Sequence, residues 1–391
     1  MSNQPEKPKL LQILSSIGTG GAEGYSLKIA SSAKAKNWDV YVAFPQVEAT
    51  SSLVQKYLNQ GISYYPLSLS MASRINFKTL NSEFPNFLQT LFLLRKIKAD
   101  AVHITLPWPD RGFANIMASA FFKKPTLVVF QLVPNKIRMS SRQIRAYEWA
   151  YKRNQTWVAV SNQNRKVISE IFHIPFQDIE LVYNGARITE NRCDDLQPKI
   201  AKKLREELNL PSESRLLLTV GRLDSQKGHI DIIPAIPHLV KDFPDIYFIW
   251  AGEGQLRQTL EQKVKEYAVS DRVFFLGHRS DIQELYQASD LFLFPSYFEG
   301  QPFALMEAMT FGLPIVSTSV SGIPEIIEHS IHGLLFRAGD SCDLLETVRF
   351  ALNNPDLLKK MSLKAKSRIN LFSEEKMIDE TLGLLSSMLN T

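Results

Sequence analysis

Strand-length apolar runs alternate with amphipathic stretches in two successive series, and this alternation restricts the fold more than any other feature. Parallel neighbouring strands need a crossover between them, and the crossover is usually a helix. The pattern therefore predicts an α/β protein with two doubly wound, Rossmann-like domains that face each other across a cleft. The apolar runs are 10–17, 39–44, 99–107, 125–132, 156–161 and 179–185 in the first series, and 215–223, 246–252, 273–277, 291–296, 313–318 and 333–336 in the second.

A polar stretch from about 190 to 213 separates the two series and indicates the linker. We expect an N-terminal domain at 1–195 and a C-terminal domain at 196–372. The segment 373–391 reads as a helix with Ser373 as its N-cap and acidic residues in its first turn. We expect this helix to pack back on the N-terminal domain.

Composition narrows the class of protein. The 391 residues are 45% hydrophobic and 22% charged, which is typical of a globular protein. There is no apolar run of membrane-spanning length and no signal-peptide pattern. Cys193 and Cys342 are the two cysteines, too far apart in the sequence to imply a disulfide framework or a zinc site. We therefore expect a cytoplasmic protein.

The net charge of +5 is unevenly distributed, because residues 1–198 carry +10 and the remainder carries −5. A basic first half suggests an anionic partner for that half. Chance variation of surface charge is the alternative. No nucleic-acid-binding motif accompanies the charge, so we do not expect a nucleic-acid partner.

Three glycine-containing turns follow predicted strands. In 18–23, "GTGGAE", Gly20 and Gly21 would let backbone amides approach an anion at a helix N-terminus. In 220–229, "VGRLDSQKGH", the cations Arg222 and Lys227 stand five residues apart and together suit a pyrophosphate. The turn "AGEGQL" repeats the strand-then-glycine form at Gly252. Taken alone, each turn is also compatible with a tight connection or a pair of solvated cations.

The stretch "EGQPFALME", residues 299–307, joins a predicted strand ending at Ser296 to a predicted helix. Pro302 fits the first helical position, and Gly312 and Pro314 would end the helix. Glu299 would then lie in the loop and Glu307 inside the helix. Free amides at the helix start could hold negative charge between the two acids. Two ordinary surface acids are the alternative.

The second-half motifs together resemble the family 4 retaining glycosyltransferases of the GT-B fold. The resemblance is dense over about 200–345, with "GRLDSQKG", "AGEGQL", "EGQPFALMEAMTFGLPIVSTSVSGIPEIIE" and "HGLLF" in this order. It implies transfer of a sugar from a UDP-, GDP- or ADP-sugar to a glycan or lipid-linked acceptor, with retention at the anomeric carbon. It also implies that neither a cofactor nor a metal is required.

The resemblance further implies the roles of individual residues. Arg222 and Lys227 would hold the donor diphosphate, Glu299 would bind the transferred sugar, and Glu307 would bind the ribose hydroxyls. Gly20 and Gly21 would bring amides to the leaving phosphate. The remaining donor-side positions would be Gly252, then His278 and Arg279 near the base, and Pro302, Phe303, Ala304 and Leu305. These last four would lie against the sugar and phosphates.

The first half departs from the family pattern. Many relatives carry two histidines, H-x-H, at the end of a first-domain strand, whereas this chain has His103 followed by Thr105. His103 is therefore either a catalytic residue beside the reacting sugar or a packed, hydrogen-bonded histidine. Phe130-Gln131 stands where relatives often have another histidine. The donor side is thus better supported than the acceptor side.

The segment 134–154 carries six cations, one acid and the aromatic residues Tyr147, Trp149 and Tyr151. A basic amphipathic helix with aromatics could lie on an anionic membrane surface, which would suit a lipid-linked acceptor and a peripheral place on the inner membrane face. A solvated helix face is the alternative.

Three other functions remain open, because a fold does not determine a function. A nucleotide-sugar epimerase would need additional carboxylates or histidines around the sugar, and a phosphorylase would need a pocket for pyridoxal phosphate. A non-catalytic sugar-nucleotide-binding module is the third reading. The joint presence of Arg222, Lys227, Glu299 and Glu307 counts against the binding module.

Overall fold

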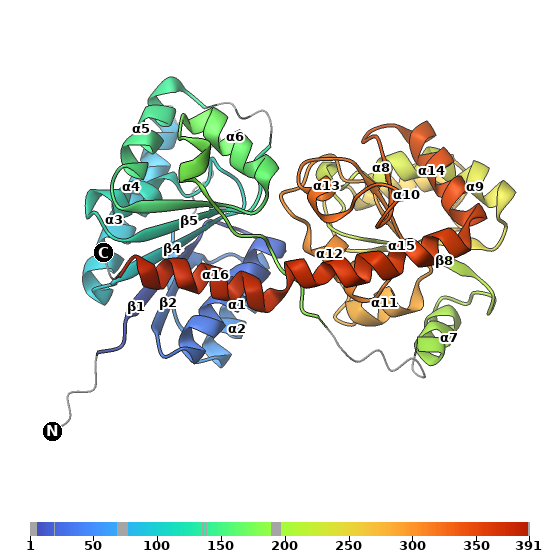
Figure 1. Ribbon diagram of the computed structural model, residues 1–391, viewed down its shortest axis with the longest axis horizontal. Helices are drawn as coiled ribbons and strands as arrows, with labels where there is room; N and C mark the ends of the chain where they lie inside the picture. The colour runs from blue at the N-terminus through green and yellow to red at the C-terminus, as the bar shows by residue number, and fades with distance from the viewer. Residues whose placement is uncertain are drawn as a thin grey trace. The chain divides into compact units, whose positions relative to one another are not determined.

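A computed structural model describes residues 6–18, 20–68, 77–134, 137, 139–188 and 197–389, without the side chains of 77–82 (Figure 1). The chain forms two compact units. The first unit contains Met1–Asn184 and Glu375–Thr391, and the second contains Gly185–Glu374. The predicted domain boundary at 195/196 lies outside the described residues.

Seven parallel strands form the sheet of the first unit, in the order β3-β2-β1-β4-β5-β6-β7. The chain moves outward from β1 to β3 and then returns to β4, so β1 and β4 meet at a topological switch point. The strands are β1 (Lys9–Leu14), β2 (Asp39–Pro45), β3 (Ser63–Leu67), β4 (Ala101–Leu106), β5 (Thr126–Phe130), β6 (Gln155–Ala159) and β7 (Glu180–Leu181).

Helices cover this sheet. The helix α16 contacts α1, because Tyr25 Oη lies 3.3 Å from Thr381 Oγ1 and Lys36 Nζ lies 2.6 Å from Asp379 Oδ1. The helices of the first unit are α1 (Gly21–Ala35), α2 (Ser51–Asn59), α3 (Phe77–Ile97), α4 (Phe113–Phe121), α5 (Ser141–Tyr151), α6 (Asn162–Phe172) and α16 (Glu374–Ser387).

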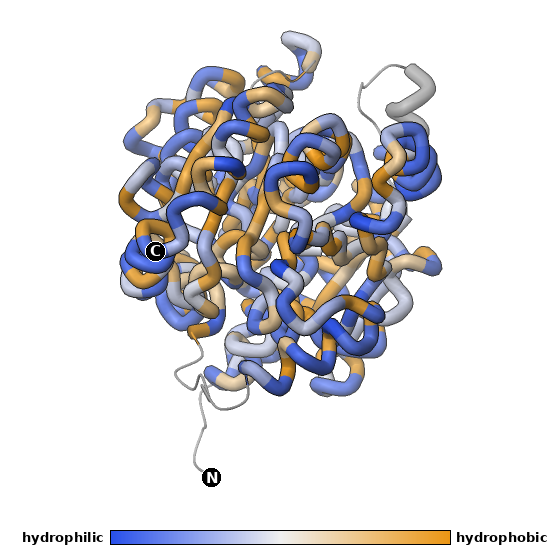
Figure 2. Tube along the Cα trace, turned by 90° about the vertical axis from the view of Figure 1, so that its right-hand side faces the viewer, coloured by the Kyte–Doolittle hydropathy of each residue, from blue (hydrophilic) through white to orange (hydrophobic). Residues whose placement is uncertain are grey.

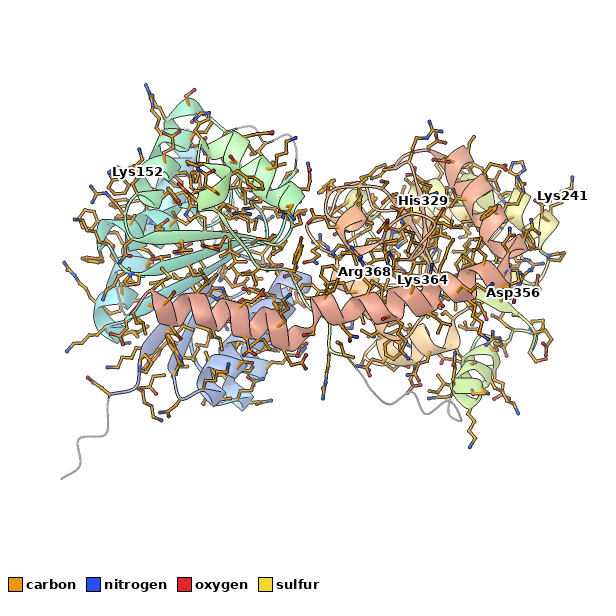
Figure 3. All side chains as sticks on the ribbon, viewed as in Figure 1. Lys152, Lys241, His329, Asp356, Lys364 and Arg368 are labelled. Atoms are coloured by element: carbon orange, nitrogen blue, oxygen red, sulfur yellow. The ribbon has the colours of Figure 1, made fainter. Side chains whose placement is uncertain are left out.

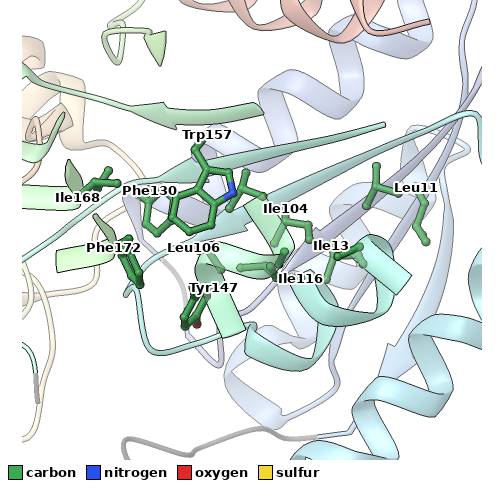
Figure 4. Close-up of a cluster of buried hydrophobic side chains, with 14 of the residues drawn as sticks. Leu11, Ile13, Ile104, Leu106, Ile116, Phe130, Tyr147, Trp157, Ile168 and Phe172 are labelled. Atoms are coloured by element: carbon green, nitrogen blue, oxygen red, sulfur yellow. The ribbon is translucent and has the colours of Figure 1, made fainter. Parts of the chain in front are cut away.

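The core of the first unit contains a cluster of aromatic rings between the sheet and α5 and α6 (Figure 4). The Phe172 ring lies edge-on to Tyr147 and Trp157, with centroids 4.9 Å and 5.2 Å away. Edge-to-face pairs of this kind contribute about 0.5–1.5 kcal/mol each beyond their burial. Tyr147 is therefore a core residue.

The sheet of the second unit has six parallel strands in the order β10-β9-β8-β11-β12-β13, and its switch point lies between β8 and β11. The strands are β8 (Arg215–Val220), β9 (Ile246–Ala251), β10 (Val273–Gly277), β11 (Leu291–Phe294), β12 (Ile315–Thr318) and β13 (Leu334–Phe336). The helices are α7 (Gln197–Glu207), α8 (His229–Ile232), α9 (Ile236–Asp242), α10 (Arg257–Glu266), α11 (Ile282–Ala288), α12 (Phe303–Thr310), α13 (Ile323–Ile326), α14 (Ser341–Asn353) and α15 (Pro355–Arg368).

The predicted fold class is confirmed, because both units are parallel sheets with helices. Apolar colours follow the strands, and hydrophilic colours dominate the outer helices and loops (Figure 2). Within the described ranges, no helix is both long enough and apolar enough to cross a bilayer.

Two predicted details were wrong. The edge strand β3 was missed, because Leu67 is its only buried residue and Pro66 interrupts it, so no apolar run marks it. His103 does not end its strand, because β4 continues to Leu106 and pairs His103 with Gln12 and Leu127 on its two neighbours.

Candidate functional site

The loops that leave β8 and β11 diverge from the switch point of the second sheet. In a parallel α/β sheet, ligands bind outside the carboxyl ends of the strands at this point. The first loop contains Arg222 and Lys227, and the second contains Glu299. The predicted donor residues therefore lie where the topology favours a ligand.

Lys227 and Glu299 form an ion pair between these two loops. Lys227 Nζ lies 2.5 Å from Glu299 Oε1, and the side chains are only 16% and 7% exposed. The ammonium group also lies 5.3 Å from the centre of the Phe294 ring, at the end of β11. A buried charge of either sign is costly without its partner, so each side chain holds the other in place.

Backbone geometry brings the two loops together. Gly228 has φ +66°, and a Cβ at this position would lie 2.0 Å from the carbonyl oxygen of Pro295. The side-chain amide of the buried Gln226 donates to the Phe298 carbonyl at 3.0 Å, and its backbone carbonyl accepts from the Tyr297 N–H at 2.8 Å. Contacts of Gln226 and Gly228, on either side of Lys227, thus hold the loop after β8 against the loop after β11.

Asp224 shapes the 3₁₀ turn Ser225–Lys227 by accepting hydrogen bonds from the N–H groups of Gln226 and Lys227 at 3.1 and 3.3 Å. It also lies 3.3 Å from Arg222 Nε. The Arg222 side chain is 56% exposed and donates to Gln226 Oε1 at 3.2 Å. Its guanidinium group therefore faces solvent beside the buried ion pair, held by two neighbours.

Helix α12 places the second acid. Pro302 is its N-cap, with φ −74° and ψ 121°, so the prediction that Pro302 occupies the first helical position was wrong by one residue. Gly312 follows the helix at φ +60°, which allows the chain to turn. The first-turn amides of an eight-residue helix such as α12 lack partners within the helix and direct a partial positive charge beyond its N-terminus.

Glu307 lies inside α12 and is half-buried. The fully buried Tyr286, on α11, places its hydroxyl 3.0 Å from Glu307 Oε2 and 3.1 Å from the Ala304 carbonyl. Burial first, and then the charge of Glu307, raise the pKa of Tyr286 well above its usual value. The tyrosine therefore keeps its proton and orients the carboxylate.

The loop after β9 lies against the loop after β8. A Cβ on Gly252, which has φ +150°, would lie 2.0 Å from the Gly221 carbonyl oxygen. Leu223 N–H donates to the Glu253 carbonyl at 3.0 Å, and Leu256 N–H donates to the Leu223 carbonyl at 2.9 Å. In the described structure, Gly252 thus serves the close approach of two backbone segments.

The turn after β10 contains His278, which is exposed, and Arg279. Arg279 donates to Glu207 at 2.5 Å and to Asp281 at 2.7 Å. These hydrogen bonds, Glu207 first, raise the pKa of the guanidinium group. The Arg279 side chain is therefore held by two carboxylates, so a contact with a nucleotide base would have to come from His278 or from the backbone.

His229, two residues after Lys227, is buried with its ring 5.2 Å from Trp250 and edge-on to it. Burial, and to a lesser extent the charge of Lys227, lower the pKa of His229 to about 3. Neither ring nitrogen has a hydrogen-bond partner among the described residues. The ring is therefore neutral at physiological pH.

At the first turn of α1, Gly20 is the N-cap in an extended conformation and Gly21 is the first helical residue. Thr19, between the other residues of this turn, lies outside the described residues. Glu23 is buried in the same turn and accepts a hydrogen bond from the Ser16 hydroxyl. A buried carboxylate therefore stands beside the amides that were expected to face a phosphate.

His103 is fully buried in the first unit. Its Nδ1 lies 3.0 Å from the Gln12 side-chain amide, and its Nε2 lies 3.4 Å from the Tyr25 hydroxyl. Burial lowers its pKa to about 3. The structure thus gives the packed, hydrogen-bonded alternative for His103, with no surface open to a substrate.

A small pocket opens at the carboxyl ends of β1 and β2 in the first unit, beside its switch point. Half-buried Arg111 and buried Asn115 supply its polar groups. Asn115 in turn donates to Thr90 Oγ1 at 2.8 Å. The pocket is lined by Leu14, Ser15, Ile17, Pro45, Leu67, Asn86, Arg111 and Asn115.

Two family models match the chain in succession. The model described as Glycosyltransferase Family 4 matches residues 19–190, and the model described as Glycosyl transferases group 1 matches residues 201–368. The chain belongs to the family 4 glycosyltransferases. The two matches fall on the first and second sheets, so this glycosyltransferase carries both halves of the GT-B fold.

Similar proteins include other glycosyltransferases. An uncharacterized glycosyltransferase of Haemophilus influenzae is 32% identical over 174 residues, which is 44% of this chain and about half, 49%, of that relative. A Campylobacter jejuni protein is 24% identical over 98% of this chain and 99% of its own length. It is described as a GalNAc-alpha-(1->4)-GalNAc-alpha-(1->3)-diNAcBac-PP-undecaprenol alpha-1,4-N-acetyl-D-galactosaminyltransferase.

A solved structure is also similar. The crystal structure of Anabaena HepE in complex with UDP has a TM-score of 0.80 at 20% identity, covering 97% of this chain and 100% of that one. At this identity the likeness shows the fold alone. The comparison therefore supports two GT-B domains in this glycosyltransferase and leaves its ligands to be argued from its own residues.

Sequence reasoning missed three residues that build the site of this glycosyltransferase. Gln226 and Gly228 join the two loops, and Tyr286 orients Glu307. Gln226 and Gly228 lie inside the motif "GRLDSQKG" that carried the resemblance, so their positions were visible. Their partners were not, because each contact links residues far apart in the sequence.

Proposed function

We propose that this glycosyltransferase moves a sugar from a nucleotide-diphosphate sugar to a lipid-linked or glycan acceptor, with retention at the anomeric carbon. The observation that carries the proposal is the buried pair of Lys227 and Glu299, which joins two loops at the switch point of the second sheet. A buried ion pair adds little net stability compared with apolar packing, so its presence at a ligand-binding edge favours a chemical role.

The donor diphosphate would bind Lys227, Arg222 and the N-terminus of α12. Breaking the bond between the anomeric carbon and the diphosphate oxygen leaves a sugar with oxocarbenium character and adds negative charge to the leaving group. A mobile ammonium group, a planar guanidinium group and fixed helix amides can stabilise that charge without reorganising. In this proposal these groups alone stabilise the negative charge of the leaving diphosphate, without a metal ion.

Glu299 would exchange partners when the donor binds. In the described structure its carboxylate is held by Lys227, and its N–H donates to Ser321 Oγ at 3.3 Å. A diphosphate would draw Lys227 away, which would free the carboxylate to accept a hydrogen bond from a sugar hydroxyl. The pair would therefore keep the empty site neutral and would separate only when both charges gain new partners.

Glu307 would bind the ribose hydroxyls of the nucleotide. Its orientation is set by Tyr286, whose hydroxyl lies 3.0 Å from one carboxylate oxygen. Two ribose hydroxyls can donate to one carboxylate. Tyr286 would thus act as a positioning residue for donor binding and would not contact the reacting atoms.

The acceptor would bind through the first unit. The basic charge of the first half and the pocket with Arg111 suit an acceptor that carries phosphate. The Campylobacter relative bears a name with a diphosphate-linked undecaprenol acceptor, which supports a lipid-linked class. The acceptor oxygen would bond to the anomeric carbon on the face the leaving group vacates, and its proton would pass to the leaving phosphate.

The test is to incubate the full chain with UDP-, GDP- and ADP-sugars, with and without polyprenyl-diphosphate-linked sugar acceptors, and to measure the nucleoside diphosphate released. Acceptor-dependent release with an α-configured product from an α-configured donor, read by NMR, is the expected result. A changed sugar on an intact nucleotide would indicate an epimerase. Donor binding without turnover on every acceptor would indicate a binding module.

A further inference from the structure

Helix α3 carries a stripe of exposed apolar side chains on the first unit. Phe84, Leu88 and Phe92 recur at four-residue spacing and are 58%, 48% and 61% exposed. This spacing places them on one face of the helix. Single exposed apolar residues are common on protein surfaces, whereas a contiguous stripe of large ones marks an interaction site.

The stripe continues across the neighbouring helices. Helix α4 packs between α3 and α5 (Figure 1). Phe121, at the end of α4, is 60% exposed, and its ring lies 6.4 Å from the Phe87 ring of α3. Trp149 on α5 is 41% exposed. The outer sides of three adjacent helices thus present large apolar side chains to solvent.

The segments that carry these apolar side chains are rich in cations. The stretches 84–98, 121–124 and 141–153 contain nine Lys and Arg residues and one acid, Glu148, which lies 2.8 Å from His173. Lys152, which directly follows α5, is exposed; it is labelled in Figure 3.

The cations also lie directly on the aromatic rings. The Arg153 guanidinium carbon lies 4.2 Å from the centre of the Trp149 ring. Lys96 Nζ lies 5.8 Å from the centre of the Phe92 ring. Aromatic groups and cations thus share one surface, rather than forming separate apolar and basic areas.

We propose that this cationic-aromatic surface, formed by 84–98, 121–124 and 141–153, lies on an anionic lipid bilayer. Aromatic and aliphatic side chains can enter the boundary between headgroups and acyl chains while the cations attract anionic headgroups. The near absence of acids fits a uniformly anionic partner better than a protein surface of mixed charge. The inference does not depend on the proposed reaction.

The inference replaces the membrane surface predicted from sequence. Of the three aromatic residues in 134–154, Tyr147 is in the core and Tyr151 is half-buried, so only Trp149 is exposed. Asn135, Lys136 and Arg138 of that segment lie outside the described residues. The apolar contribution therefore comes chiefly from α3, which the sequence reasoning did not consider as a membrane contact.

The test is co-sedimentation of the full chain with vesicles of phosphatidylcholine alone and of phosphatidylcholine mixed equally with phosphatidylglycerol. We expect binding about tenfold or more tighter to the anionic vesicles, weakening as salt is added. The double variant Phe84→Ser, Phe92→Ser should lose about tenfold in affinity for anionic vesicles. The matched control, Phe350→Ser with Leu363→Ser on the second unit, replaces side chains of similar exposure, 47% and 58%, and should bind as the unaltered chain does.

A second variant keeps the test decisive if the apolar one folds poorly by circular dichroism. Lys96→Glu with Lys152→Glu should abolish the preference for anionic vesicles. Equal binding of the unaltered chain to both vesicles would overturn the proposal, as would unchanged binding by folded Phe84→Ser, Phe92→Ser. A dimer in sedimentation velocity that this variant dissociates would also overturn it, because the stripe would then join two copies of the chain.

Discussion

The two sheets have the same kind of switch point but use polar side chains differently there. In the second unit, the buried Glu299 is paired with Lys227 across two loops. In the first unit, the buried Glu23 accepts from a serine hydroxyl, and the nearby strand β4 carries the neutral His103. In the second unit the buried carboxylate is thus paired with a cation beside the proposed donor site, whereas the buried carboxylate of the first unit accepts from a neutral hydroxyl.

The largest expected effect comes from breaking the ion pair. Lys227→Met should lower kcat by ~10²–10³, because a stabilising charge for the leaving group is lost. It should also cost about 3 kcal/mol of unfolding free energy, because Glu299 stays buried without its cation. Urea unfolding and donor turnover measure the two effects separately.

The control for that variant is Lys227→Met combined with Glu299→Gln. Removing both charges should restore most of the unfolding free energy and none of the activity. If the double variant regains turnover together with stability, the ion pair serves only the stability of the fold. The difference between the two units would then have no role in catalysis.

The next prediction concerns the close approach of the two loops, where Gly228 lies against the Pro295 carbonyl. Gly228→Ala should destabilise the second unit by about 3 kcal/mol, because its φ is positive and the new Cβ would meet the Pro295 carbonyl. The matched change in the first unit, Gly24→Ala within α1, meets nothing within 4 Å and should stabilise by about 0.5–1 kcal/mol. Hydrogen exchange by mass spectrometry resolves the two units, and equal effects of the two changes would contradict the comparison.

Each unit contains a fully buried histidine, and these histidines should make the stability of the folded chain depend on pH. Burial lowers the pKa values of His103 and His229 to about 3, below the value of about 6.5 expected when unfolded. Unfolding then takes up a proton at each histidine, so stability is full above pH about 6.5 and falls as the pH decreases toward 3.

Each histidine should contribute about 1.4 kcal/mol per pH unit in this window. Replacing His103 with Gln should remove that slope from the first unit only, and His229→Gln from the second only. Urea unfolding between pH 5 and 6.5, followed by hydrogen exchange in each unit, measures this. Slopes that do not change in the substituted unit would mean that the histidine is protonated in the folded chain.

The smallest effect concerns the orientation of Glu307. Tyr286→Phe removes a hydroxyl that lies 3.0 Å from the carboxylate, which is about 1 kcal/mol for one hydrogen bond. Donor KM should rise about fivefold while kcat changes little, because the ribose is bound equally in the ground and transition states. A fall in kcat at constant KM would instead place Tyr286 near the reacting atoms.

Periodicity predicted most of the fold, because buried parallel strands are continuous apolar runs and their crossover helices are amphipathic. It failed where burial was incomplete, as at the edge strand β3, in which Leu67 alone is buried. It also failed for Tyr147, because composition alone does not tell which face of a basic helix is buried. A local sequence pattern therefore indicates whether a segment is a helix or a strand better than it indicates which face of that element is buried.

The site was predictable in its residues but not in its contacts. The motifs placed Arg222, Lys227, Glu299 and Glu307 in loops and on a helix beside strand ends. Lys227 and Glu299 are 72 residues apart, and their pairing depends on the close approach that Gly228 allows. Such contacts follow from tertiary structure, which no local pattern specifies.

The most direct test of the proposed donor site is a crystal structure of the chain soaked with an intact UDP-, GDP- or ADP-sugar. We predict a diphosphate within hydrogen-bonding distance of Lys227 Nζ and the first amides of α12, with the Lys227–Glu299 contact broken. A nucleotide bound elsewhere, or bound at this edge with that ion pair intact, would contradict it.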